Sequence, residues 1–259
     1  MKITTWNVNS LTARLQHVLD WLAANPVDVL CLQELKMTDD KFPREALVAA
    51  GYPHCEAFGQ KTYNGVAVIS RHPLRDVVRN IPQFPDESSR VLTATVEAEG
   101  LPAIRLVNGY FVNGQAPGSD KFAYKMAWLD GLRRHVADEM SRHARLVLLG
   151  DFNIAPEDRD SYDPEGLRET IHHTSEERAH FRELLSLGLT DAYRLFEQPE
   201  KSYSWWDYRM LGFQKNRGLR IDHVLVSEAL RPQVRACAID RAPRKWPQPS
   251  DHAPVTVDL

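Results

Sequence analysis

The chain has 259 residues, of which 43% are hydrophobic and 26% charged, ordinary values for a globular protein with one large domain or two small ones. No apolar run approaches the roughly 18–20 residues that cross a bilayer, and the first residues lack the regions of a signal peptide. The three cysteines, Cys31, Cys55 and Cys237, are odd in number and far apart, which indicates neither a disulfide framework nor a zinc site. We therefore expect a cytoplasmic protein without a membrane segment.

The net charge of −3 argues weakly against a general polyanion binder, but the distribution of charge matters more than the sum. Residues 209–220 hold four basic residues and no acid, and residues 231–245 hold five basic residues and one acid. Residues 156–165, in contrast, are rich in acids. Each patch alone is best interpreted as a solvated face. Together, basic faces and an acidic pocket would suit a metal-dependent enzyme that acts on a phosphate polymer.

The predicted strands and helices are mixed along the chain. Residues 3–8 read as a strand, and residues 11–24 as a helix that ends near Pro26. A buried strand follows at 27–32, and Asn64-Gly65 forms a turn into a strand at 66–69. Further strands are predicted at 90–96, 104–110, 145–149, 221–226, 236–240 and 255–257. With no internal repeat, low-complexity tract or long linker, the pattern indicates one α/β or α+β domain over residues 1–259.

Two further helices are predicted at 119–143 and 175–187. The first is long and amphipathic, with Ser119 or Asp120 as its N-cap. The second starts with Ser175-Glu176-Glu177-Arg178, which does not complete a capping box because its fourth residue is neither Glu nor Gln.

The stretch GDFNIAP, residues 150–156, follows the apolar run Leu146 to Leu149. Four branched aliphatic residues bounded by glycine are typical of a strand covered on both faces. Asp151 and Asn153 then stand at its carboxyl end, where open α/β sheets bind ligands. A simple turn before Pro156 explains the stretch equally well, because Asp and Asn are common turn residues.

Polar residues recur where the other predicted strands stop. Each of them alone is best explained as a turn or a cap. Together they would gather carboxylates, amides, a tyrosine and a histidine on one face, as a Mg²⁺-assisted phosphate-ester hydrolase requires. These residues are Asn7, Glu34, Asn108, Tyr110, Asn113, Asp151, Asn153, Asp222, Asp251 and His252.

Other chemistries are disfavoured by missing motifs. The chain has no Gly-x-x-x-x-Gly-Lys-Ser/Thr loop, no Gly-x-Ser-x-Gly elbow and no His-Glu-x-x-His. His172 and His173 are adjacent, so they cannot both face one metal from a regular element. Taken alone, they are best interpreted as surface-loop residues.

Seven motifs occur in order between Lys2 and Val257: TWNVNSL, LQELK, NGY, GDFNIAP, SWWDYR, NRGLRIDH and SDHAPV. In this the chain resembles the exonuclease III family of DNA repair nucleases, which includes abasic-site (AP) endonucleases and lies within the endonuclease/exonuclease/phosphatase superfamily. The resemblance implies a four-layered α/β sandwich, with two mixed β-sheets face to face, helices outside and the active site at one end. It also implies a monomer that acts on double-stranded DNA, with Mg²⁺ as cofactor and Mn²⁺ as a substitute.

The resemblance also implies roles for the matching residues around the metal. Glu34 would be the principal Mg²⁺ ligand, with Asn7 and Asp251 close to the metal. Asp151 would orient or deprotonate the attacking water, and a carboxylate beside Mg²⁺ has its pKa lowered. Asn153 would help to hold the phosphate.

The remaining roles concern the phosphoryl oxygens. By the same resemblance, His252, oriented by Asp222, would donate to a non-bridging oxygen, and Tyr110 and Asn113 would complete the phosphate pocket. A carboxylate at Asp222 favours the imidazolium form of His252, which makes it a charge-assisted donor.

Residues 205–219 would form the DNA-facing loop, with Arg220 directly after it. Tryptophan faces stack on sugars or bases, and basic side chains meet phosphates without reading sequence. We expect Trp206 to pack inward and its neighbour to face the DNA. The DNA-binding residues implied are Trp205, Arg209, Lys215, Arg217, Leu219 and Arg220.

The chain departs from the family at His172 and His173. Related AP endonucleases commonly have a small residue and an aromatic residue there, beside the pocket for a flipped-out abasic sugar. The imidazole of His172 would block that sugar and leave a 3′ terminus accessible. The hypothesis is therefore that 3′→5′ exonuclease and 3′-phosphatase/phosphodiesterase activities persist while AP endonuclease activity is weakened.

Three alternatives remain open. In the first, the loop with His172 is shifted so that the pocket stays open, and the protein is a full AP endonuclease. Another is a superfamily phosphatase on a different phosphate ester, which the tryptophan-rich loop and basic residues disfavour. The third is a non-catalytic DNA-binding module, which the complete set of polar site residues disfavours, because crowded carboxylates repel one another.

Overall fold

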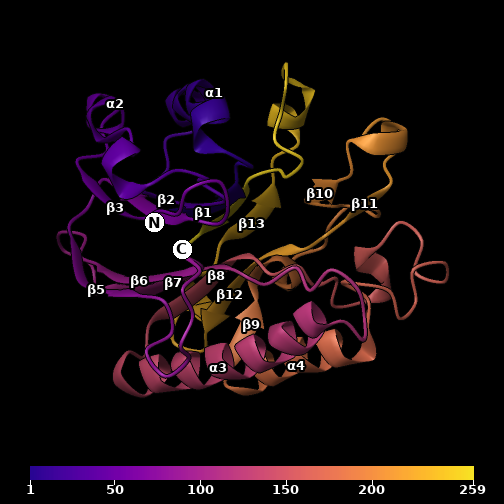
Figure 1. Cartoon of the computed structure of the whole chain (residues 1–259). Helices are drawn as coiled ribbons and strands as arrows, with labels where there is room; N and C mark the ends of the chain where they lie inside the picture. Colours follow the sequence, from indigo (N-terminus) through magenta and orange to yellow (C-terminus); the bar gives the residue numbers. More distant parts are fainter.

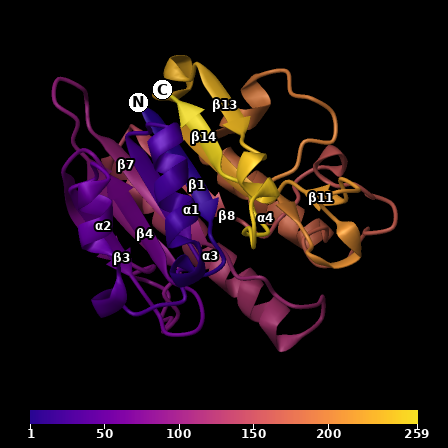
Figure 2. The same cartoon turned by 90° about the horizontal axis from the view of Figure 1, so that it is seen from above.

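The computed structural model describes residues 1–259 and contains two six-stranded β-sheets packed face to face (Figure 1). Helices cover both outer faces, and the view from above shows two of them lying over the first sheet (Figure 2). The N- and C-termini lie close together, with the Leu259 N–H donating to the Met1 carbonyl at 2.9 Å.

The first sheet takes strands from both ends of the chain. Its strands are β1 (Lys2–Asn7), β2 (Val29–Gln33), β3 (His54–Phe58), β4 (Val66–Ser70), β13 (Ala236–Ile239) and β14 (Val255–Asp258). They are ordered β13-β14-β1-β2-β4-β3. Only β1 and β2 run parallel, so the sheet is mixed.

The second sheet repeats this plan. Its strands are β5 (Leu74–Arg79), β6 (Val91–Val96), β7 (Ile104–Tyr110), β8 (Leu146–Asp151), β9 (Leu189–Asp191) and β12 (Asp222–Ser227). They are ordered β5-β6-β7-β8-β12-β9, and only β7 and β8 run parallel. A parallel pair needs a crossover connection, which is a helix in both sheets. Helix α1 (Leu11–Ala24) joins β1 to β2, and α3 (Asp120–Arg142) joins β7 to β8.

Three hydrophobic clusters separate four layers. The cluster between the sheets contains Ile3, Cys31 and Leu149. A second cluster, with Trp21, lies between the first sheet and the helices α1 and α2 (Arg44–Ala49). A third, with Trp128, lies between the second sheet and the helices α3 and α4 (Ser175–Ser186). The predicted α/β sandwich of four layers is confirmed.

The apolar run before Asp151 is explained by these layers. In β8, Val147 and Leu149 pack against the first sheet, whereas Leu146 and Leu148 pack toward α3. Because side chains alternate along a strand, a strand covered on both faces needs apolar residues at every position. Gly150 then allows the close approach of β7, because a Cβ there would lie 1.9 Å from the Gly109 carbonyl oxygen.

The structure corrects the capping of one helix. The side chain of Thr174 accepts from the Glu177 N–H, and the Glu177 side chain accepts from the Thr174 N–H, both at 3.1 Å. Helix α4 therefore does have a capping box, which starts one residue before the Ser175 tested in the sequence. The strands β3, β5 and β9 were missed because they lie at or near sheet edges and carry polar residues.

A lobe at one end of the sandwich holds a two-stranded sheet, β10 (Trp205–Trp206) and β11 (Gly218–Leu219), seen at the right of Figure 1. Short 3-10 segments occur at Asp39–Lys41, Asp158–Asp160, Ala192–Leu195, Arg209–Leu211, Arg231–Gln233 and Ala242–Lys245. None of the helices combines the length and the apolar character needed to span a membrane.

Candidate active site

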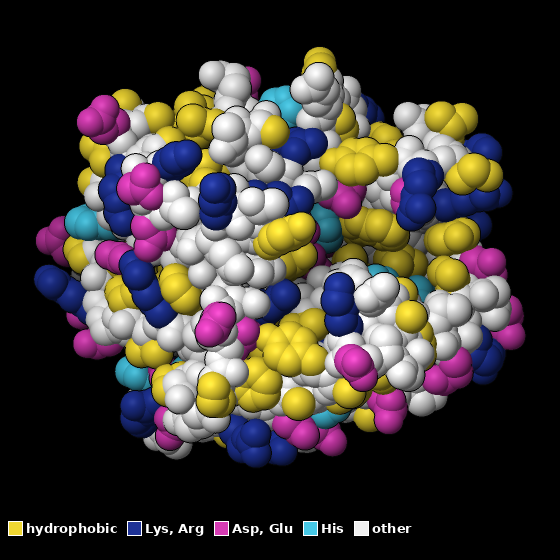
Figure 3. All heavy atoms as spheres, viewed as in Figure 1, with side chains coloured by type: hydrophobic (Ala, Val, Ile, Leu, Met, Phe, Trp, Pro, Cys, Tyr) yellow, Lys and Arg dark blue, Asp and Glu magenta, His cyan; other side chains and the backbone are white.

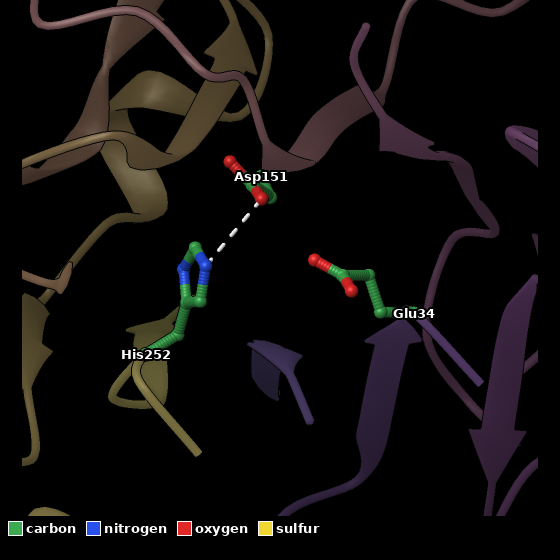
Figure 4. A group of neighbouring side chains, drawn as sticks. All are labelled: Glu34, Asp151 and His252. Carbon is green, nitrogen blue, oxygen red and sulfur yellow. Dashed lines mark ion pairs between the residues drawn. The ribbon is translucent and has the colours of Figure 1, made fainter. Parts of the chain in front are cut away.

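Both parallel strand pairs end at the same edge of the sandwich. Asn7 ends β1, Glu34 follows β2, Tyr110 ends β7 and Asp151 ends β8. Figure 4 shows Glu34 and Asp151 entering from different sheets and facing His252, which comes from the turn before β14. The predicted gathering of polar side chains at the strand ends is therefore present.

Asn7 bridges the two sheets. Its side-chain NH₂ donates to a Glu34 carboxylate oxygen at 2.8 Å and to an Asp151 oxygen at 2.9 Å. Its amide oxygen accepts from the Asn9 N–H at 2.9 Å. Asn7 therefore holds the two carboxylates in place, and the expectation that it lies close to the metal stays a prediction.

The acidic cluster consists of Glu34, Asp151 and His252, whose ligand atoms all lie within 4.8 Å of one another. Carboxylate oxygens are the ligands that hard divalent cations prefer, so Glu34 and Asp151 fit such an ion. Sequence reasoning missed Lys36, whose Nζ lies 2.8 Å from a Glu34 oxygen. Its place in LQELK, two residues after Glu34, was the available signal.

Asp251 lies outside this cluster. One of its carboxylate oxygens accepts from the Asn9 amide at 3.0 Å, and the other accepts from the Trp205 indole N–H at 2.9 Å. Both Asp251 oxygens thereby join the segment after β1 to the lobe, and the expectation that Asp251 lies close to a metal stays a prediction.

His252 lies between two buried carboxylates. Its Nδ1 is 2.9 and 3.1 Å from the Asp222 oxygens, and its Nε2 is 3.6 Å from Asp151. Burial alone would lower the pKa of His252, but the charges of Asp222 and Asp151 outweigh it and raise the pKa to about 10. His252 is therefore a cationic donor near neutral pH.

The same surroundings also raise the pKa of Asp151, which disfavours its charged form. Burial raises the pKa of Asp151 to about 7, and the charge of Asp222 adds to the rise while that of His252 opposes it. Burial, followed by the charges of Glu34 and Asp151, also raises the pKa of Tyr110 well above its ordinary value. Tyr110 therefore keeps its proton and can act as a hydrogen-bond donor.

The two predicted phosphate-binding amides lie side by side. The Asn113 amide donates to the Asn153 side-chain oxygen at 3.3 Å, and the Asn153 amide donates to the Phe111 carbonyl at 3.1 Å. The Asn153 N–H donates to Asp151 at 3.0 Å. Asn153 has a φ of 51°, in the left-handed region of backbone conformation, and the hydrogen bonds just described hold it there.

A pocket of 560 Å³ lies beside the acidic cluster. A hollow with many hydrophobic side chains around it is visible on this face of the molecule (Figure 3). The pocket lies between the loop that follows β8 and the lobe. Its lining residues are Asn113, Tyr162, Leu167, Thr170, Ile171, His172, His173, Trp205, Asp207, Arg209, Met210, Gly212, Arg217 and Leu219.

His172 and His173 both line this pocket, which corrects their interpretation as surface-loop residues. His173 is only 3% exposed, and His172 is half-buried. Burial lowers the pKa of His172 to about 3, so its ring is neutral. Its Nδ1 lies 2.7 Å from the Asn153 carbonyl. Because a carbonyl only accepts, Nδ1 carries the proton and Nε2 is left as an acceptor.

The lobe residues that the sequence predicts to contact DNA differ in exposure. Arg209, Lys215 and Arg217 are exposed. Trp205 is half-buried, Leu219 is buried against the pocket, and Trp206 is fully buried as expected.

Arg220 corrects the sequence prediction. It is 1% exposed, and it donates to Asp160 at 2.7 Å and lies 2.8 Å from Asp191. A phosphate cannot reach this guanidinium, so Arg220 anchors the lobe instead of binding DNA. The exposed apolar tip of the lobe, with Met210 74% and Leu211 59% exposed, was not among the sequence predictions.

Known proteins resemble this chain along nearly its whole length. The sequence profile of the Endonuclease/Exonuclease/phosphatase family matches residues 4–252. The chain is 34% identical to exodeoxyribonuclease III of Haemophilus influenzae over 100% of both chains.

Solved structures are similar over the same length. NExo, a 3′ phosphatase from Neisseria solved with a product DNA hairpin, is 51% identical, with a TM-score of 0.96 over 100% of this chain and 99% of that one. An AP endonuclease from Archaeoglobus fulgidus is 33% identical, with a TM-score of 0.93 over the same shares. The chain therefore belongs to the Endonuclease/Exonuclease/phosphatase family, in its branch of exonuclease III-type and AP endonuclease DNA repair nucleases.

Proposed function

We propose that this enzyme is a Mg²⁺-dependent DNA repair nuclease that hydrolyses phosphate esters at the 3′ ends of duplex DNA, with residues 1–259 forming one catalytic domain. One observation carries the proposal: His252, held by Asp222, faces Asp151 and Glu34. A cationic donor opposite carboxylates suits stabilisation of phosphoryl oxygens together with activation of water. The Neisseria 3′ phosphatase and the Haemophilus exodeoxyribonuclease III support 3′ ends as the substrate.

Glu34 and Asp151 would hold the cation, with Mn²⁺ as a substitute for Mg²⁺. Their hard oxygen donors support Mg²⁺. When bound, the cation would polarise a phosphoryl oxygen and favour ionisation of water. The chain's own groups do the rest: His252 donates from Nε2 to a non-bridging oxygen, and Asp151 orients or deprotonates the attacking water. The amides of Asn113 and Asn153, with the Tyr110 hydroxyl, hold the phosphate.

Duplex DNA would lie across the lobe. The exposed basic residues Arg209, Lys215 and Arg217, together with the half-buried Trp205, support this path. We further propose that the enzyme acts as a monomer in the cytoplasm. The three buried cysteines, none of which forms a disulfide, support a reducing compartment.

We also propose that AP endonuclease activity is weak. The His172 imidazole lines the pocket and is fixed to the Asn153 carbonyl at 2.7 Å, so it would occupy space that a flipped-out abasic sugar needs. A full AP endonuclease is the second candidate. The 33% identity to the AP endonuclease of Archaeoglobus fulgidus favours it.

A labelled duplex separates these activities. One 5′-labelled duplex carries an internal abasic-site analogue and a protected 3′ end, and a second carries an unprotected 3′ phosphate. With Mg²⁺, we expect phosphate release and shortening of the second duplex, little incision of the first, and no product with EDTA. Efficient incision of the first duplex would overturn the weak AP endonuclease activity, and no product from either would overturn the nuclease function.

The variant Asp151→Asn tests the catalytic assignment. We expect hydrolysis to fall about 10²- to 10⁴-fold, as when an acid–base group is removed, with duplex affinity retained in a binding titration. Activity that persists in this variant would contradict the role of Asp151. DNA binding without any hydrolysis in the unmodified protein would indicate a non-catalytic binding module, and release of phosphate from other esters alone would indicate a different phosphatase.

A further inference from the structure

Lys125 is a charged side chain with no exposed surface, and it lies outside the acidic cluster. It sits on α3, close to the N-terminal end of that helix. Its Nζ donates to the Asn153 carbonyl at 2.8 Å, to the Asn113 carbonyl at 3.2 Å and to a Glu177 carboxylate oxygen. An ammonium group has three N–H donors, so all three are used.

Glu177, the partner of Lys125, also has no exposed surface. Its other carboxylate oxygen accepts from the N–H of Thr174 at 3.1 Å and from the hydroxyl of Thr174 at 2.9 Å. The carboxylate therefore joins Lys125 on α3 to the first turn of α4. The two helices lie together beneath the second sheet (Figure 1).

Stability alone does not explain this pair. Burial disfavours the charged form and lowers the pKa of Lys125, against the opposing charge of Glu177. A buried ion pair is often replaced by apolar residues without loss of stability, because the desolvation of both charges offsets their attraction. What an apolar pair cannot supply is a donor for two loop carbonyls.

Those two carbonyls belong to the residues that would hold the phosphate. The Asn153 backbone is left-handed, and Gly114, directly after Asn113, has a φ of 88° with the Lys125 side chain packed against it. With both carbonyls fixed toward the helix, the side-chain amides of Asn113 and Asn153 lie next to each other beside Asp151. Small shifts in such groups reduce turnover strongly.

We infer that Lys125, with Glu177 as its counterion, is a positioning residue for the reaction: it fixes the backbone of Asn113 and Asn153 so that their amides hold the phosphoryl group. This inference rests on the proposed function. Lys125 touches no substrate in this arrangement and acts only through the two loops.

The test compares two double variants in the full chain. Lys125→Met with Glu177→Gln removes both charges and keeps an acceptor for the Thr174 cap. The control is Arg105→Met with Glu139→Gln. Arg105 lies on β7 and Glu139 on α3, their ion pair measures 2.5 Å, and the side chains are 3% and 2% exposed. Phosphate release from a 3′-phosphate duplex gives kcat and KM, inhibition by inorganic phosphate probes the site directly, and thermal melting gives stability.

We expect the Lys125 double variant to lose kcat by about 10- to 100-fold and to be less inhibited by phosphate, with little change in duplex KM. The Arg105 double variant keeps kcat and phosphate inhibition whatever its melting temperature. Glu177→Gln alone leaves the lysine on both carbonyls, so it loses less kcat than the double variant. This single variant keeps the comparison valid if the double variant folds poorly.

Two results would overturn the inference while the proposed function stands. One is unchanged kcat and phosphate inhibition in the Lys125 double variant, and the other is an equal loss in the Arg105 control. If the unmodified enzyme neither releases phosphate nor shortens the duplex, the proposed function fails and the inference fails with it.

Discussion

The side chains at the ends of β1, β8 and β12 stand on paired strands, whereas the pocket beside them is walled mostly by loops. Asn7, Asp151 and Asp222 are at most 1% exposed. At the lobe tip, by contrast, Met210 and Leu211 are 74% and 59% exposed and both have a positive φ. The difference suggests that the sheets fix the chemistry while the loops select the substrate.

Arg220 joins the two regions. From the boundary of β11 and β12 it reaches Asp160, in the loop that leads to the pocket, and Asp191 at the end of β9. The division between strand ends and loops can therefore be tested in three ways. One removes Arg220, others change the strand ends or the loops separately, and the last removes a charge from the surface of the lobe.

Arg220→Met should have the largest effect. It leaves the buried carboxylates of Asp160 and Asp191 without their main counterion, so we expect the free energy of unfolding to fall by about 3–5 kcal/mol in a denaturant titration. The control is Arg209→Met, which breaks an exposed pair with Asp207. Its effect should be far smaller, because the ion pair is exposed to solvent. Equal effects of the two variants would show that Arg220 is not an anchor.

Asp222→Asn changes the sheet region alone. Without this carboxylate the pKa of His252 falls from about 10 toward its ordinary value, so the cationic donor is lost as pH rises. The rate of the unmodified enzyme should hold to about pH 9, whereas that of the variant should fall about tenfold per pH unit above its new pKa. Asp138→Asn, an exposed change on α3, should leave the pH profile of kcat unchanged. If the rate of Asp222→Asn does not fall at alkaline pH, the donor role of His252 is contradicted.

His172→Gly changes the loop region alone. Glycine adopts the φ of 71° at this position and removes the imidazole from the pocket. We expect incision at an abasic-site analogue to rise about 10-fold or more relative to 3′-phosphate release, because pocket volume discriminates by this order. His180→Ala, on α4 outside the pocket, is the control. An unchanged ratio would mean that the pocket already admits the sugar.

Arg217→Ala should have the smallest effect. Removing one phosphate contact should weaken duplex binding uniformly across sequences and reduce the slope of log affinity against log salt by about 1. Binding titrations at several salt concentrations measure this slope. Arg231→Ala, an exposed change outside the lobe, is the control and should leave the slope unaltered.

Strand periodicity and the end positions of polar residues were sufficient to predict most of both sheets and the gathering of Asn7, Glu34, Asp151 and His252. They were sufficient because a strand buried on both faces must be apolar and because the ends of neighbouring strands share an edge. The edge strands β3 and β5 could not be predicted, because polar and charged residues interrupt their apolar pattern.

The sequence by itself therefore determined which residue types stand at the strand ends, and hence the class of chemistry. Only the tertiary structure decided their partners. In the folded protein, Arg220 is buried against the carboxylates of Asp160 and Asp191. The two Asp251 oxygens accept hydrogen bonds from Asn9 and Trp205, and Lys125 donates to the carbonyls of two loops. The physical reason is that burial and hydrogen-bond satisfaction depend on segments far apart in the chain, and no local pattern records them.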